Sequence, residues 1–394
     1  MVGGGGVGVR GRVLGLIAAG AAAVAGACAR CPPTRSALLL PEGIRERVSI
    51  EHAGARVQVE DPSPPDGPVV IHLPEVVRVD ARATWETGAA EGVALPMRRS
   101  GRLWAVRATA VAVGGERSSV PDLRVDTGLG GSLSVSSRHA APAGMFLVDE
   151  VPEGQSYTAF GAKPTRFGVF AALDLGAAEI APIGAQVECG GPGFDPLIGL
   201  GALEVFGGVV FDWEARRMIL LPRGARVDAV RALDGWRSTA WTRDPVTSRR
   251  DSLDERGSGA RAFSIAGGGR WALVTIGGVE HAAVLDTGFT ADVFSFERTG
   301  LGRDRREWSG SGFGRSAAFE LADLDTAVEI GGVAFDGVSI LEPTVSPADF
   351  AQRAGADLVI GLGILEQYPV WLDFERDEAR FWVSEEPMPV FPGV

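Results

Sequence analysis

The sequence predicts an all-β protein made of two tandem β lobes, with an extra N-terminal β segment. Its 394 residues include 55 Gly and 24 Pro and few long periodic runs, which favours many short strands and turns over helix bundles. An Asp-Thr-Gly turn occurs twice, at positions 126 and 286, and a seven-residue apolar block recurs at nearly the same spacing. A repeated supersecondary pattern at one spacing indicates an internal duplication.

Residues 1–27 are predicted to be a signal peptide. Arg10 and Arg12 supply positive charge, and the apolar run of residues 13–27 is short for a membrane span. The run ends in Ala25-Gly26-Ala27, directly before Cys28, and resembles the box at which bacterial lipoproteins are lipidated, with Ala25 in place of the usual Leu. We expect lipidation at Cys28 and export to the cell envelope, periplasmic or on the outer surface. Plain secretion and an uncleaved anchor are the alternatives.

Residues 28–36 form a tether, and residues 37–96 the N-terminal β segment. Short β-branched runs such as 69–73 lie between Pro and Gly breaks, which is typical of strands. The segment carries no candidate catalytic residue. Two cysteines remain after Cys28. Cys31 and Cys189 either pair in an oxidising compartment or are two unrelated thiols.

The first lobe spans residues 97–223 and the second spans 260–385. In the first, a β-rich run from Trp104 turns at Gly114-Gly115 and returns to the Asp-Thr-Gly at 126–128. In the second, a run from Trp271 turns at Gly277-Gly278 and returns to 286–288. Paired glycines between β-rich runs predict hairpins, because the favoured two-residue turns need positive φ angles. Each Asp-Thr-Gly is therefore expected to end the second strand of a hairpin.

The apolar block Ile-Gly-Leu-Gly-x-Leu-Glu completes each lobe, at 198–204 and at 360–366. A further hairpin pattern follows each copy. Residues 224–259, rich in Arg, Asp and Ser, are predicted to be an exposed linker with a short helix around Val227 to Leu233. Residues 386–394 form a tail.

An apolar strand leading into Asp-Thr-Gly, with a hydrophobic-Ile-Gly block late in the same lobe, resembles the aspartic peptidases, both pepsin-like and retropepsin-like. The resemblance covers about 280 residues, from Trp104 to Val383. It implies a bilobal acid-protease fold, closest to bacterial envelope members built from short retropepsin-like lobes. It also implies that Gly199 and Gly361 let the late strand approach Asp126 and Asp286.

By this resemblance Asp126 and Asp286 form a catalytic dyad. Two carboxyl groups that share a site cannot both ionise, so one acts as general base on a water while the other keeps a proton. The loop residues Thr127, Gly128, Thr287 and Gly288 are expected to support the dyad. Thr290 fills the place of a hydroxyl that commonly bonds the carboxylate, whereas the first lobe has Gly130 there and Ser132 two residues further along.

The resemblance further implies hairpin flaps, no metal and no cofactor. Tyr157 and Trp308 are the flap candidates, although an aromatic residue in a loop often only packs on its own strand. A formal charge of -12, without a basic stripe, argues against nucleic acid as a partner. The only lysine, Lys163, follows Ala162, which excludes a phosphate-binding loop that ends in Gly-Lys. We expect a peptide or protein substrate, a monomer, and membrane contact only through an N-terminal lipid.

Three hypotheses follow from the sequence. The chain is an aspartic-type endopeptidase, or a non-catalytic peptidase-like envelope protein that holds extended peptides by strand addition. In the third, each lobe pairs with another chain, and a homodimer carries two sites.

Overall fold

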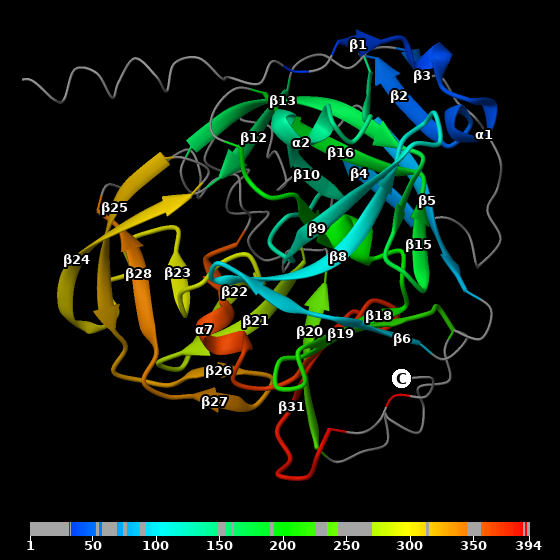
Figure 1. The fold of residues 1–394 in the computed structure, drawn as a ribbon. Coiled ribbons are helices and arrows are strands. Elements are labelled where there is room, and N and C mark those ends of the chain that lie inside the picture. Colours follow the sequence, from blue (N-terminus) through cyan, green and yellow to red (C-terminus); the bar gives the residue numbers. More distant parts are fainter. Residues whose placement is uncertain are drawn as a thin grey trace, which may run out of the picture.

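The computed structural model describes residues 31, 33–52, 55–56, 69–73, 77–86, 92–148, 154–158, 161–189, 193–224, 235–242, 270–312, 315–344, 356–388 and 391. This part of the chain is predominantly β, as the sequence predicted, and its strands form two sheets (Figure 1). Among the described residues, no helix is both long enough and apolar enough to cross a bilayer.

The first sheet has 16 strands with mixed parallel and antiparallel pairing. They are β1 (Thr34–Arg35), β2 (Val48–His52), β3 (Ala55–Arg56), β4 (Val69–Leu73), β5 (Val77–Trp85), β7 (Arg98–Ser100), β8 (Leu103–Val111), β9 (Arg117–Asp126), β10 (Leu133–Ser136), β11 (Phe146–Val148), β12 (Gly154–Thr158), β13 (Gly161–Phe170), β14 (Ala172–Asp174), β15 (Ala178–Ala181), β16 (Ile183–Glu188) and β17 (Leu197–Gly199).

The second sheet has 15 strands. They are β6 (Val93–Pro96), β18 (Gly208–Asp212), β19 (Arg217–Leu221), β20 (Trp236–Thr242), β21 (Trp271–Ile276), β22 (Val279–Leu285), β23 (Val293–Ser295), β24 (Arg303–Gly312), β25 (Arg315–Asp323), β26 (Val328–Ile330), β27 (Val333–Phe335), β28 (Ser339–Pro343), β29 (Leu358–Ile360), β30 (Val370–Asp373) and β31 (Glu378–Trp382). The described helices are single turns: η1 (Ala37–Leu39), α1 (Glu42–Arg45), α2 (Ser137–Ala140), α3 (Leu200–Leu203) and α7 (Leu362–Leu365).

The two sheets share one strand order. The first runs β13-β16-β10-β17-β9-β8-β14-β15, and the second runs β25-β28-β23-β29-β22-β21-β26-β27. Each member of the first series has a counterpart at the same place in the second. We call residues 97–223 the first repeat and 260–385 the second repeat, of which the described residues are discussed. The duplication inferred from two short motifs therefore extends over eight strands in each repeat.

Both predicted glycine hairpins are present. β21 and β22 pair antiparallel with Ile276 opposite Val279, so Gly277 and Gly278 form the turn. Their φ angles are +59° and +80°, a region that side chains with a Cβ rarely adopt. β8 and β9 pair in the same way around Gly115. The hairpins deliver Asp126 and Asp286 to equivalent ends of the two sheets.

The repeats are joined through a shared sheet. β18 and β19 belong to the first repeat, yet they lie in the second sheet, where β18 pairs antiparallel with β30 and Phe211 lies opposite Val370. Trp371 and Trp236 pack there with their ring centroids 5.7 Å apart. The core therefore continues from one repeat into the other.

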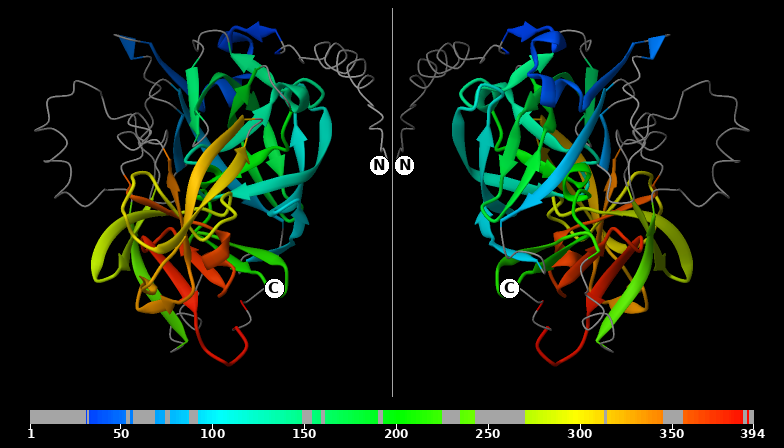
Figure 2. Two further views of the ribbon diagram at one scale, coloured as in Figure 1. Left: turned by 90° about the vertical axis from the view of Figure 1, so that its left-hand side faces the viewer. Right: turned by 90° about the vertical axis from the view of Figure 1, so that its right-hand side faces the viewer.

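The N-terminal β segment adds strands to both sheets rather than forming a free domain. β5 pairs with β15 of the first repeat, and β6 pairs with β19 in the second sheet. β1, which falls in the expected tether, pairs with β11. Cys31 and Cys189 form a disulfide with their Cα atoms 5.4 Å apart, so the open question about these cysteines is settled in favour of pairing. Figure 2 shows the blue N-terminal strands beside the cyan and green strands of the first repeat.

The linker expected at 224–259 contains a strand. β20 pairs with β31 on one side and β21 on the other, and both Trp236 and Trp241 are buried. An exposed connection is therefore the wrong description of residues 236–242, because two large indoles pack into the core there. The predicted signal peptide, the lipidation site Cys28 and the helix around Val227 to Leu233 lie outside the described residues.

Candidate active site

The two Asp-Thr-Gly turns meet where the sheets face each other. β9 ends at Asp126, and Asp286 follows the last residue of β22. Their side-chain carboxyl groups are joined by a hydrogen bond. Both aspartates are half-buried, so the pair keeps some surface open to solvent while protein atoms crowd around it. Residues 160 positions apart are thereby brought into direct contact.

Backbone amides hold each carboxylate in place. The Leu129 N–H donates to Asp126 Oδ1 over 2.9 Å, and the Gly288 N–H donates to Asp286 Oδ1 over 2.7 Å. Both turns need a glycine because the carboxyl group of the opposite turn lies where a Cβ would be. A Cβ added to Gly128 would lie 2.7 Å from Asp286 Oδ1, and one added to Gly288 would lie 2.6 Å from Asp126 Oδ1. Only glycine leaves room for the two carboxyls to approach.

The two threonines cross between the repeats. Thr127 Oγ1 donates to the Leu285 carbonyl over 2.6 Å, and Thr287 Oγ1 donates to the Val125 carbonyl over 2.9 Å. Each hydroxyl also accepts the backbone N–H of the other threonine, at 3.0 and 3.1 Å. All four bonds are buried, where an unpaired donor or acceptor is costly. They lock the two turns to each other and fix the spacing of the acids.

The late strand of each repeat inserts beside its turn, as the resemblance implied. β17 runs parallel to β9, with Gly199 opposite Asp126, and pairs with β10 on its other side. β29 lies in the same way between β22 and β23. A Cβ on Gly199 would sit 2.5 Å from the Leu129 carbonyl oxygen, and one on Gly361 would sit 2.6 Å from that of Phe289. These glycines therefore make room for the turn backbone rather than for the carboxylates themselves.

The pKa values of the two carboxyls are raised unequally. Burial raises the pKa of Asp126, and the hydrogen bonds from Asp286 and from backbone amides partly offset that increase. The pKa of Asp286 is raised well above its usual range, first by burial and then by the charge and the hydrogen bond of Asp126. Asp286 therefore keeps its proton to higher pH and donates it to the ionised Asp126. The pair titrates as a unit.

The expected supporting hydroxyls are not in contact with the carboxyls. Thr290 is exposed, and no hydrogen bond connects it with Asp286 in the described part of the chain. In the first repeat Gly130 offers no side chain, and the buried Ser132 Oγ has no partner among the described residues. The role anticipated for Thr290 is therefore not seen here. The Gly288 amide, and not a hydroxyl, holds Asp286 Oδ1.

The flap candidates lie on hairpin strands. Tyr157 is on β12, opposite Ala162 of β13, and its side chain is outside the described residues. Trp308 is on β24, opposite Phe319 of β25, and the two rings are 5.9 Å apart. Trp308 thus packs on its own hairpin, as the alternative interpretation had it. The hairpins themselves occur in both repeats at the equivalent place.

Two interactions between the repeats were missed by the sequence analysis. Glu204, at the end of the first apolar block, is bound by Arg270 at the start of β21, with Nε and Oε1 2.7 Å apart and both side chains buried. Its counterpart Glu366 accepts the indole N–H of Trp104 over 2.7 Å and pairs with Arg99. The sequence signal was the glutamate repeated at the end of an otherwise apolar block.

Comparisons of the chain with protein-family models and with curated proteins find no match. Within the described residues, no group of three or more His, Cys, Asp or Glu side chains is placed to hold a metal ion. The chemistry that this geometry can perform is proton transfer by a carboxyl pair in which one member is protonated and the other is ionised.

Proposed function

We propose that the chain is an aspartic-type endopeptidase that hydrolyses peptide bonds with a water activated by Asp126 and Asp286. The observation that carries the proposal is the hydrogen-bonded carboxyl pair with unequally raised pKa values. Such a pair presents a base and an acid within reach of the same substrate, which is the requirement for general acid–base hydrolysis. Partial exposure leaves the pair accessible to a ligand.

In the proposed reaction, ionised Asp126 accepts a proton from a water that lies between the carboxyls. The water oxygen attacks the carbonyl carbon of the scissile peptide bond, while Asp286 gives its proton to the carbonyl oxygen. The tetrahedral intermediate then carries two hydroxyl groups. It collapses when Asp126 gives its proton to the nitrogen of the departing amine and one hydroxyl returns a proton to Asp286, so the C–N bond breaks and a carboxylic acid and a free amine leave. The pair is thereby restored to its starting protonation.

The fold supports the family assignment that we propose, a bilobal pepsin-like or retropepsin-like acid-protease fold. Three features argue for it: the eight-strand order shared by both repeats, the late strand inserted beside each turn, and the threonines crossed between the turns. Since both acids come from one chain, a single molecule supplies the whole dyad, and we propose a monomer. This placement argues against two separate homodimeric sites.

The direct test is hydrolysis of an unstructured protein over a pH series, with and without a transition-state mimic of the pepstatin type. We expect a bell-shaped dependence of rate on pH, because the reaction needs one proton on the pair. The high-pH limb reflects deprotonation of Asp286 and lies above the usual range of an aspartate. Asp126→Asn and Asp286→Asn should each abolish turnover, by at least about 1,000-fold. Partial activity in either variant would contradict a single shared dyad.

A second candidate is a non-catalytic protein that binds extended peptides at the same place. The observation in its favour is that neither carboxyl has a hydroxyl partner among the described residues at the two expected places, Gly130 and Thr290. Tight binding of the mimic, with no hydrolysis by the wild type at any pH, would select this candidate over the endopeptidase.

We also propose that the protein acts in the cell envelope, exported and held by a lipid at Cys28. The Cys31–Cys189 disulfide supports an oxidising compartment, because such bonds persist mainly outside the cytosol. Mass spectrometry of the mature N-terminus, with Cys28→Ala as control, tests the lipid attachment. A mature protein that begins elsewhere and carries no acyl chain would contradict it.

A further inference from the structure

An arginine shares the strand face of the first acid. In β9 the side chains alternate between the two faces, so Arg124 and Asp126 lie on the same face, two residues apart. That separation is about 7 Å along a strand. Arg124 is therefore the nearest side chain before Asp126 on the face that carries the carboxyl pair. The Arg124 side chain is 25% exposed, so part of it is open to solvent and to a ligand.

The Arg124 side chain is held by fixed partners. Its Nη2 lies 2.6 Å from Asp195 Oδ2, and its guanidinium donates to Ser100 Oγ over 3.3 Å. Asp195 lies just before β17, the strand inserted beside β9, and is 37% exposed. The first repeat thus presents an ordered, accessible ion pair beside the dyad.

The residues at the equivalent place in the second repeat are mostly apolar. The residue two places before Asp286 is Val284, which is buried and packs with Phe294, Phe296 and Phe319. Phe289, directly after the turn, and Trp308 form the partly exposed edge of this group. Asp357 takes the place of Asp195, and there its carboxylate accepts the Ala282 N–H over 3.1 Å. The two sides of the dyad therefore differ in chemistry although they share a fold.

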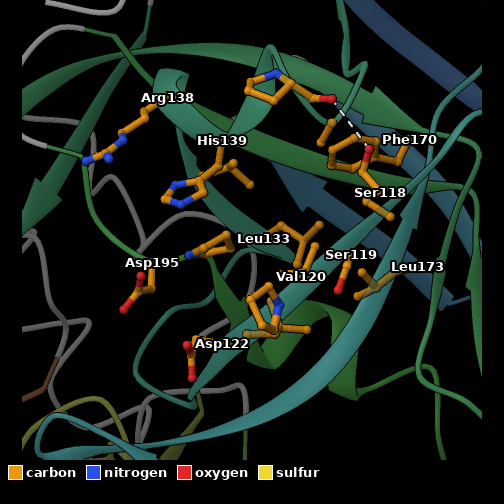
Figure 3. A pocket seen from close by; sticks show the side chains of 17 residues that line it. Ser118, Ser119, Val120, Asp122, Leu133, Arg138, His139, Phe170, Leu173 and Asp195 are labelled. Carbon is orange, nitrogen blue, oxygen red and sulfur yellow. Dashed lines mark hydrogen bonds between the residues drawn. The ribbon is translucent and has the colours of Figure 1, made fainter. Parts of the chain in front are cut away.

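A cavity in the first repeat adjoins Asp195, the partner of Arg124. It has a volume of about 190 Å³, and Figure 3 shows Asp122 and Asp195 near one another at one edge of it, with Leu133, Phe170 and Leu173 among its apolar lining. Asp122 is on the same face of β9 as Arg124, two residues further from the dyad, and is paired with Arg98 at 2.8 Å. Asp195, the partner of Arg124, thus also lines a space large enough for part of a side chain.

We propose, on the basis of the proposed function, that the substrate is a peptide with opposite character on the two sides of the scissile bond. The residue that lies against the first repeat is polar, with hydrogen-bonding groups that engage Arg124 and Asp195. The residue against the second repeat is apolar or aromatic and packs on Phe289 and its neighbours. An apolar side chain placed on the ion pair would strip water from both charges and return no hydrogen bond, so it is rejected.

The test is the cleavage pattern of the wild-type protein on a mixture of proteome-derived peptides, read by mass spectrometry. We expect one side of the cleaved bond to be enriched in polar residues and the other in aromatic and aliphatic ones. Arg124→Val, which installs the residue of the second repeat, should raise cleavage at apolar residues on the polar side alone, by about 10-fold to 100-fold. Arg124→Gln keeps hydrogen-bonding groups and should retain the wild-type pattern.

Arg117→Val is the matched control, since Arg117 lies on the same strand in an ion pair with Asp174 at the far end from the dyad. Its pattern should equal that of the wild type. A wild-type pattern that is apolar on both sides overturns the inference without any variant, and leaves the endopeptidase proposal intact. An Arg124→Val protein that melts like the wild type yet cleaves the same peptides also overturns it. Absence of cleavage by the wild type removes the proposed function, and the inference with it.

Discussion

The two repeats agree in how they hold the carboxyl pair and differ in the residues that flank it. Gly128 and Gly288 face the opposite acids in the same way, and Thr127 and Thr287 exchange equivalent bonds. Two residues before the acids, one repeat has Arg124 and the other has Val284. The residues of the two turns cannot change independently, because each threonine bonds the threonine of the other turn. The flanking positions carry no such mutual constraint and are free to diverge.

The largest effect is expected from substitutions of Gly128 and Gly288, which test whether the two turns are equivalent. Gly128→Ala and Gly288→Ala each place a methyl within van der Waals overlap of the opposite carboxyl, so the acids must separate. We expect loss of activity and a fall in the free energy of unfolding of about 1–3 kcal/mol in both. Chemical denaturation and a peptide hydrolysis assay measure this. Gly43→Ala, which meets no atom within 4 Å, is the control. An active Gly128→Ala protein would break the equivalence of the turns.

The buried ion pair between the repeats tests how strongly they depend on each other. Arg270→Ala removes the cation that pairs with the buried Glu204 carboxylate and should lower the free energy of unfolding by about 3–5 kcal/mol. Arg117→Ala breaks an exposed pair and should change it by no more than about 1 kcal/mol. Urea unfolding curves for both variants decide the point. Equal effects would mean that Arg270 stays hydrated and the contact adds little.

Thr127 and Thr287 test how much the four hydrogen bonds between the two turns stabilise the protein. Thr127→Val keeps the volume of the side chain, removes one buried donor and leaves the Thr287 N–H without its acceptor. We expect a loss of about 2–3 kcal/mol, and a similar loss for Thr287→Val, because the four bonds are symmetric. Thr127→Ser restores the hydroxyl and should recover most of the stability. Different losses of unfolding free energy in Thr127→Val and Thr287→Val would show that the two threonines do not contribute equally.

The acids should differ in their effect on stability against pH. Folding raises the pKa of Asp286, so its contribution is complete below the pKa of the unfolded chain and is lost as the pH rises through the folded pKa. Asp286→Asn cannot ionise, so its melting temperature should exceed that of the wild type by a few degrees at neutral pH and match it in acid. Asp126→Asn should show a smaller gain, because that pKa is raised less.

Asp323→Asn is the control of opposite sign. Hydrogen bonding from Arg306 lowers the pKa of Asp323, so its contribution is present at neutral pH and disappears as the pH falls. Melting curves from pH 3 to pH 8 report all three variants. A larger gain for Asp126→Asn than for Asp286→Asn would reverse the assignment of acid and base.

Local chemistry in the sequence was enough to predict the β architecture and the hairpins. Paired glycines favour turns, and short β-branched runs favour strands. The repetition of these signals then indicated a duplicated unit. That Asp126 and Asp286 form a pair was expected from the resemblance to the aspartic peptidases.

The tertiary structure decided what depends on partners far apart in the chain. The threonine hydrogen bonds join residues 160 positions apart. β20 is a strand because β21 and β31 lie on either side of it. Arg124 is held in a fixed position only through its ion pair with Asp195. Such pairings leave no local pattern, because any polar side chain can be satisfied by water until the fold removes it. The sequence, through its repeated motif and the resemblance, therefore pointed to Asp126 and Asp286. The packing of one repeat on the other determined which groups contact them.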